Sequence, residues 1–141
     1  MTDTNIPLSR KLVTTLIKKG TEMTESVYEV VKTEGLTIQQ FNVLRILRGR
    51  NGKAAGLQDV SKEMIHSNSN TTRVIDKLIA KGFVLRVQCS KDRRKIQLTI
   101  TKKGLKVLNN LDDRIDERES QLINNLEKEQ IDQVLEILSK M

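Results

Sequence analysis

A polar turn and a short amphipathic segment lie at the centre of the chain, in the sequence His66-Ser67-Asn68-Ser69-Asn70-Thr71-Thr72-Arg73-Val74-Ile75-Asp76-Lys77-Leu78-Ile79-Ala80-Lys81-Gly82. At about 100° per residue, the apolar side chains cluster on one side of a helix: Val74, Ile75, Leu78 and Ile79. The opposite side is polar: Ser69, Arg73, Asp76 and Lys77, with Thr72 at the margin. The turn supplies helix-capping residues, and Gly82 is a natural residue to end the helix. Such a segment is either an ordinary surface helix or one that lays its polar side in the major groove of duplex DNA.

Two short segments with the alternation of β-strands follow this helix, Phe83 to Val87 and Lys95 to Thr101. The polar turn between them, Gln88 to Arg94, predicts a β-hairpin with an exposed tip. The tip reads Ser90-Lys91-Asp92-Arg93-Arg94-Lys95 and carries four basic residues and one acid. It is either a solvated charged turn or a cationic finger. A finger of this kind reaches phosphates or inserts an arginine into a narrow, A·T-rich minor groove.

Three helices are predicted before the central segment. A long first helix ends at Glu34-Gly35, and its Gly20 permits a kink. Thr37 and Gln40 form a predicted capping box at the start of the second helix, and a short third helix covers about Leu57 to Ile65. The order helix, short helix, polar turn, helix and hairpin is that of a winged helix-turn-helix domain.

The first helix and the helical C-terminal third carry apolar stripes without an obvious partner in this winged core. One such stripe contains Leu108, Leu111, Ile115 and Leu122. These helices either fold back on their own subunit or form an intertwined dimer interface, and pairing doubles the number of base pairs that can be read. We therefore divide the chain into an N-terminal dimerisation helix (1–34), a winged helix-turn-helix DNA-binding domain (35–101) and C-terminal dimerisation helices (102–141).

The region from Leu36 to Leu108 resembles the multiple-antibiotic-resistance regulator (MarR) family. The matching segments, in the family's order and spacing, are Leu36-Thr37-Ile38-Gln39-Gln40-Phe41-Asn42-Val43-Leu44, Asn70-Thr71-Thr72-Arg73-Val74-Ile75-Asp76-Lys77-Leu78, Lys81-Gly82-Phe83-Val84-Leu85-Arg86, Asp92-Arg93-Arg94 and Leu98-Thr99-Ile100-Thr101-Lys102-Lys103-Gly104. The resemblance implies a mainly α fold with a small β-hairpin wing (α+β). It also implies a sequence-specific regulator of transcription, a homodimeric repressor on a pseudo-palindromic operator that a small-molecule ligand releases. The alternative is a winged-helix protein-interaction module without sequence-specific DNA binding.

The resemblance also assigns roles within the wing. Arg94 matches the arginine placed in the minor groove, and Asp92 matches the carboxylate that orients it. Opposite charges in matching positions lead to the hypothesis that Arg93 pairs with Asp76 and braces the wing against the recognition helix. The full set of expected DNA-binding residues is Ser67, Asn68, Ser69, Asn70, Thr72, Arg73, Lys77, Lys91, Arg93 and Arg94, with Asp76 and Asp92 as wing-orienting residues.

Family regulators commonly hold small, often aromatic or phenolic, ligands between the dimer helices and the winged domain. Binding there shifts the spacing of the two recognition helices and lowers DNA affinity. The expected lining residues in this chain are Tyr28, Phe41 and Met64. Aromatic residues make up only 2% of the chain, which argues against recognition of an aromatic ligand.

Composition limits the classes of function. The 141 residues carry a net charge of +7 with 30% charged and 37% hydrophobic residues, which suits an anionic partner such as nucleic acid. No apolar run approaches the roughly 20 residues of a membrane span, and no signal peptide is recognisable, so we expect a cytoplasmic protein. The scarcity of aromatics disfavours single-stranded binding by base stacking.

No catalytic, metal or cofactor site is predicted, and we expect no enzyme activity. His66 is the only histidine and has no second ligand nearby. The acidic cluster Asp112, Asp113, Asp116 and Glu117 is typical of a solvated helix face. Cys89 is the only cysteine and lies near Arg86 and Lys91, so it is either a redox sensor or a half-buried structural thiol. The redox-sensing branch of the family carries its cysteine in the N-terminal helix, where this chain has none, which favours the structural role.

Overall fold

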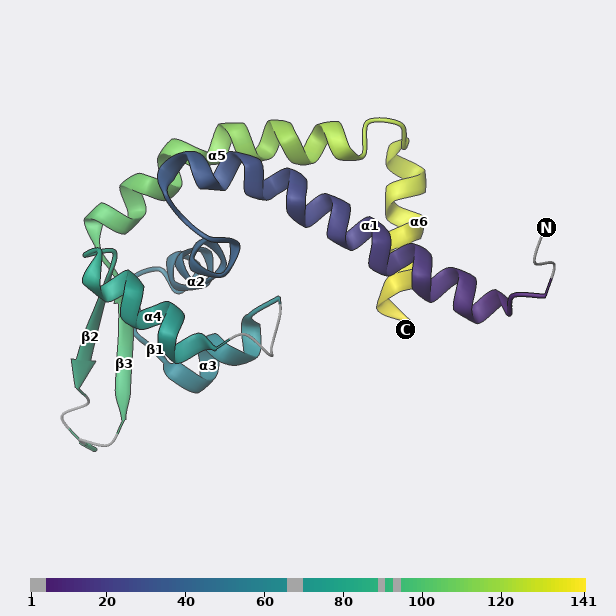
Figure 1. Cartoon of the computed structure of the whole chain (residues 1–141). Helices are drawn as coiled ribbons and strands as arrows, with labels where there is room; N and C mark the ends of the chain where they lie inside the picture. The colour runs from purple at the N-terminus through teal and green to yellow at the C-terminus, as the bar shows by residue number, and fades with distance from the viewer. Residues whose placement is uncertain (1–4, 66–69, 89–90, 93–94) are drawn as a thin grey trace.

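The computed structural model describes residues 5–65, 70–88, 91–92 and 95–141. The elements in chain order are α1 (Leu8–Val31), the short helix η1 (Lys32–Glu34), α2 (Ile38–Arg48), β1 (Ala55–Gly56), α3 (Leu57–Glu63), α4 (Thr71–Ala80), β2 (Val84–Gln88), β3 (Ile96–Ile100), α5 (Lys102–Leu122) and α6 (Lys128–Ser139). In Figure 1, α1 and α5 lie side by side as a long arm, and α2, α3, α4 and the sheet form a group beneath one end of it. The predicted mainly helical fold with a small β wing is confirmed.

The junction between the arm and the winged domain follows the predicted signals. Gly35 ends η1 with a φ of +74°, a left-handed conformation that glycine adopts without a Cβ penalty. The Gln40 backbone N–H then donates to Thr37 Oγ1 at 3.1 Å, and the Thr37 N–H donates to Gln40 Oε1 at 3.0 Å. The predicted capping box is therefore confirmed, and it begins α2.

The sheet has three antiparallel strands in the order β1-β3-β2. The predicted hairpin is present, with Val84 opposite Ile100 and Gln88 opposite Ile96. The two-residue strand β1 is not predicted by the sequence pattern; it pairs Ala55 with Leu98 on the other side of β3. A strand of two residues is too short to show the period-two alternation by which strands are recognised.

One hydrophobic core lies between α2, the inner face of α4, the sheet and the adjoining parts of the arm. Its buried apolar residues are Val30, Val31, Leu36, Phe41, Val43, Leu44, Leu47, Ala55, Val60, Met64, Ile75, Leu78, Phe83, Val84, Leu98, Leu108, Leu111 and Ile115. This core fixes the position of α4 relative to the wing.

The distal parts of the arm pack little against their own chain. Helix α1 runs through Gly20 without a break, but only Val30 and Val31 of its 24 residues are buried. Helix α6 turns off α5 at the end of the arm farthest from the sheet (Figure 1), and none of its residues is buried.

Among the described residues, no helix combines the length and the apolar character that crossing a membrane requires.

Candidate nucleic-acid interface

Helix α4 presents the two sides that its sequence predicts. Asn70 caps it, because Asn70 Oδ1 accepts from the Arg73 N–H at 3.3 Å. Ile75 and Leu78 are buried in the core, and Val74 and Ile79 are half-buried against it. The apolar side of α4 is therefore the anchored side, and the helix cannot rotate without exposing it to water.

The opposite side of α4 faces solvent, and Thr72, Arg73, Asp76 and Lys77 are all exposed there. Arg73 and Lys77 lie one helical turn apart and line a hollow of about 230 Å³ between α4 and the start of α2. Thr37 and Gln39 line the same hollow. Two long cations beside a recess suit a negatively charged backbone such as that of DNA.

The wing extends beside α4, and two of its tip cations are described. Lys91 and Lys95 are both exposed, and the Lys95 N–H donates to the Asp92 carbonyl oxygen at 3.0 Å. Five predicted DNA-binding residues lie outside the described residues: Ser67, Asn68, Ser69, Arg93 and Arg94. His66 and Cys89 also lie outside them. The expected orientation of Arg94 by Asp92 therefore stays a prediction.

An ion pair joins the wing to α4. Arg86 Nη2 on β2 lies 3.0 Å from Asp76 Oδ1 on α4. The sequence predicts a wing brace through Arg93, which is outside the described residues, and sequence reasoning missed Arg86. The alternation of the strand could have indicated this contact. Val84 is buried in the core, and residues two apart lie on the same face of a strand. Arg86 therefore lies on the face of β2 that is turned toward α4.

The base of the wing is tied to the start of α5 through Thr101. Its N–H donates to the Phe83 carbonyl oxygen at 3.0 Å, and its hydroxyl donates to the Gly82 carbonyl oxygen at 2.7 Å. The same hydroxyl oxygen accepts from the Gly104 N–H at 3.1 Å and caps α5. The end of α4, the wing and α5 are thereby held together at one point.

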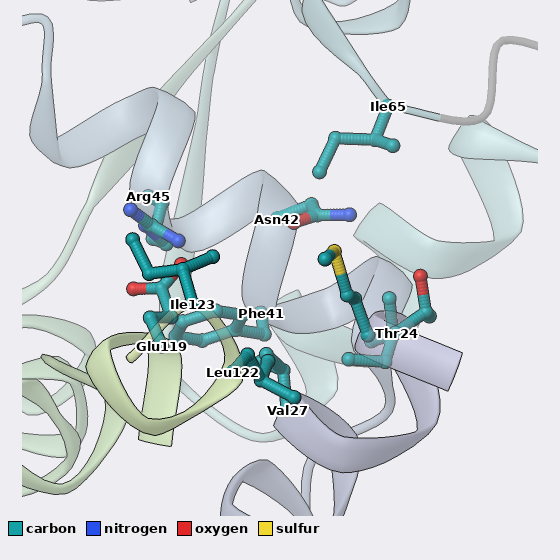
Figure 2. A pocket seen from close by; sticks show the side chains of 11 residues that line it. Thr24, Val27, Phe41, Asn42, Arg45, Ile65, Glu119, Leu122 and Ile123 are labelled. Carbon is teal, nitrogen blue, oxygen red and sulfur yellow. The ribbon is translucent and has the colours of Figure 1, made fainter. Parts of the chain in front are cut away.

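A cavity of about 330 Å³ lies between α1, α2, α5 and the segment after α3. Its lining is mostly apolar: Met23, Thr24, Val27, Ile38, Phe41, Asn42, Arg45, Ile65, Glu119, Leu122 and Ile123. Figure 2 shows Phe41, Val27 and Leu122 along one wall, Ile65 across from them and Asn42 between. The cavity therefore lies between the helical arm and the domain that carries α4.

Only one of the three expected pocket residues lines this cavity. Phe41 does, whereas Met64 is buried in the core and Tyr28 is 41% exposed on α1, and neither lines it. Sequence reasoning missed Asn42, because a polar residue on the inner side of a helix gives no sign of whether it meets core or cavity. It also missed Arg45, which is exposed and lies at the edge of the cavity.

The acidic residues of α5 include one with a structural contact. Asp112 Oδ2 lies 2.9 Å from Arg48 Nη1 and links α5 to the end of α2. Within the described ranges, His, Cys, Asp and Glu side chains form no group of three that could hold a metal ion.

Comparison with known proteins agrees with this geometry. The MarR family model matches residues 36–96, which span α2 to the start of β3. An uncharacterised HTH-type transcriptional regulator, YkoM of Bacillus subtilis, is 30% identical over 109 residues, which cover 77% of this chain and 70% of YkoM.

Two solved structures share the fold over nearly their whole length. A MarR variant from Escherichia coli complexed with operator DNA superposes with a TM-score of 0.83 at 19% identity, covering 96% of this chain and 98% of that one. BpsR of Bordetella bronchiseptica, whose DNA binding is regulated by 6-hydroxynicotinic acid, has a TM-score of 0.82 at 22% identity, covering 93% and 98%. The predicted winged-helix architecture is confirmed, and so is the expectation of a regulator rather than an enzyme. The chain belongs to the MarR family of transcriptional regulators.

Proposed function

We propose that this chain is a homodimeric repressor that binds a pseudo-palindromic operator in duplex DNA. The observation that carries the proposal is the exposed polar side of α4. Its Arg73 and Lys77 are held outward by a buried apolar side, beside a wing whose described tip residues include Lys91 and Lys95. A helix of this kind fits the major groove, and the flanking wing fits the adjacent backbone or minor groove.

The DNA-binding residues that we assign are those expected from the sequence: Ser67, Asn68, Ser69, Asn70, Thr72, Arg73, Lys77, Lys91, Arg93 and Arg94. The operator complex of the E. coli relative supports this assignment by analogy of fold. The ion pair between Asp76 and Arg86 also supports it, because it places strand β2 of the wing directly beside α4.

The homodimer is proposed from the apolar faces of the arm. Leu8 of α1 is 81% exposed, and Leu135 and Ile137 of α6 are 61% and 60% exposed. Many exposed apolar residues on helices with almost no buried residue are typical of an interface with another chain. We therefore assign 1–34 and 102–141 to dimerisation and 35–101 to DNA binding.

Release by a small molecule is proposed from the cavity between the arm and the winged domain. An occupant in contact with α1, α2 and α5 would favour one orientation of the winged domain over another. In a dimer that orientation sets the spacing of the two α4 helices, and only one spacing fits successive major grooves. Repression follows if the operator overlaps a promoter, since the bound dimer then excludes polymerase.

Selection of bound sequences from a random duplex library tests the proposal, with light scattering on the same preparation. We expect an inverted repeat whose half-sites are about 10 base pairs apart, bound by a species of twice the chain mass. Recovery of no motif would favour a protein-interaction module instead. A monomer that still selects a single half-site would overturn the dimer.

A further inference from the structure

The side chain of Asn42 is buried and faces the cavity with an unused donor. Asn42 is 7% exposed, and within the described part of the chain its Nδ2 atom has no hydrogen-bond partner. Figure 2 shows the amide nitrogen turned toward the open space beneath Ile65. Buried amide donors are nearly always satisfied in folded proteins by protein atoms or ordered water, so this donor is available to an acceptor that enters the cavity and displaces water.

The walls around Asn42 exclude a strongly polar occupant. Six of the lining side chains are aliphatic or thioether groups, Met23, Val27, Ile38, Ile65, Leu122 and Ile123, and Phe41 is the one aromatic ring. A volume of about 330 Å³ accommodates a small organic molecule whose body is hydrocarbon.

The charges at the cavity do not select an anion. Arg45 is exposed, and its guanidinium carbon lies 5.2 Å from the centre of the Phe41 ring. Glu119, also exposed, lines the same cavity from α5. A ligand carboxylate that entered the cavity would lose its water and gain only one neutral amide donor, from Asn42. The charges of Arg45 and Glu119 oppose each other and remain in solvent, so burying the carboxylate is unfavourable.

We infer that the cavity binds an uncharged, largely apolar molecule carrying a carbonyl-type oxygen, which accepts a hydrogen bond from Asn42 Nδ2. The inference rests on the proposed release by a small molecule and specifies the chemical class of that molecule. Asn42 is the specificity-determining residue, because it supplies the one buried polar contact among the described lining residues.

Three probes of similar size and different head groups test this inference: acetophenone, ethylbenzene and benzoate. Each is titrated into ¹⁵N-labelled full-length protein without DNA, and dissociation constants are taken from amide chemical-shift changes. We expect acetophenone to bind about tenfold more tightly than ethylbenzene, the ratio that one buried hydrogen bond supplies, and benzoate to bind more weakly than acetophenone.

The variant Asn42→Leu removes the donor and keeps the approximate volume. In this variant the preference for acetophenone over ethylbenzene should fall to about one, while ethylbenzene binds at least as tightly as before. The protein should remain folded, since an apolar group of similar shape replaces a buried unsatisfied amide. Asn110→Leu makes the same change on an exposed face of α5 and should keep the preference.

Three results would overturn the inference: tightest binding of benzoate, a preference that survives Asn42→Leu, or no binding of any probe at millimolar concentration. Because the titration contains no DNA, its outcome is separate from that of the operator selection. A chain that selects an operator but shows no ketone preference contradicts this inference alone. A chain that selects no operator but binds acetophenone through Asn42 contradicts the proposed function alone.

Discussion

Arg86 Nη2 lies 3.0 Å from Asp76 Oδ1, so one ion pair joins the wing strand β2 to the exposed side of α4. The two side chains are 47% and 57% exposed, and an exposed pair of this kind contributes little to stability. Its consequence is geometric, because it marks where β2 lies against the helix that we propose to enter the major groove, in an arrangement that the shared core fixes.

The first prediction concerns the coupling of these two residues. A double-mutant cycle with Asp76→Ala and Arg86→Ala should give a coupling of about 0.2–1 kcal/mol in the free energy of unfolding, measured by urea denaturation. The same cycle with Arg93→Ala in place of Arg86→Ala separates the observed partner from the one expected from the sequence. Zero coupling to Arg86 together with clear coupling to Arg93 would show that the brace runs through the wing tip.

The second prediction concerns the close approach of α5 to the base of the wing. A Cβ atom at Gly104 would lie 2.6 Å from the Phe83 carbonyl oxygen and 2.8 Å from Ile100 Cγ1. The carbonyl belongs to the backbone and cannot rotate away, so Gly104→Ala should destabilise the fold by about 1–3 kcal/mol. Thermal unfolding followed by circular dichroism measures this loss of stability.

Gly20 is the matched control for Gly104. It lies in the interior of exposed α1, and no described atom outside its helix comes within 4 Å of the position that a Cβ atom would take. Gly20→Ala should therefore stabilise the protein by about 0.5–1 kcal/mol through helix propensity. Equal effects of the two substitutions would contradict the packing explanation.

The local signals of this fold could be predicted from the sequence because they act within a few residues. Thr37 and Gln40 form their capping box three positions apart, and the two sides of α4 follow from helical period alone. The strand alternation around Leu98 likewise predicts the hairpin. In each case the interacting residues are near one another in the sequence, so the local sequence pattern is sufficient to predict the interaction.

Features that depend on tertiary packing could not be predicted in this way. The sequence places Tyr28 and Met64 at a ligand pocket, but helix rotation and packing leave one on the surface and the other in the core. Asn42 lies at a cavity because α1 and α5 leave a gap over that turn of α2. No periodicity in the sequence distinguishes a gap from a filled core.

The third prediction concerns the cations of α4. Arg73→Ala should weaken operator binding, and the slope of log affinity against log salt should become less negative by about one for each phosphate that the variant no longer neutralises. Fluorescence anisotropy at several salt concentrations measures both quantities. Lys106→Ala removes an exposed cation from α5 and should change neither the affinity nor the slope appreciably. Equal decreases in affinity for the two variants would indicate a general charge effect rather than a contact by α4.

The fourth prediction concerns the apolar face of α6. Leu135 is 61% exposed and its helix buries none of its residues, so in a monomer Leu135→Asp would have little effect on stability. If the proposed dimer buries this face, the same substitution places a carboxylate in an apolar interface, where it is costly. Light scattering should then show a shift toward the monomer mass at micromolar concentration, with a parallel decrease in operator affinity. Glu129→Gln, which removes a charge from the first turn of the same helix, should leave the mass unchanged. A Leu135→Asp protein that keeps both the dimer mass and the operator affinity would remove α6 from the interface, and α1 would have to provide it.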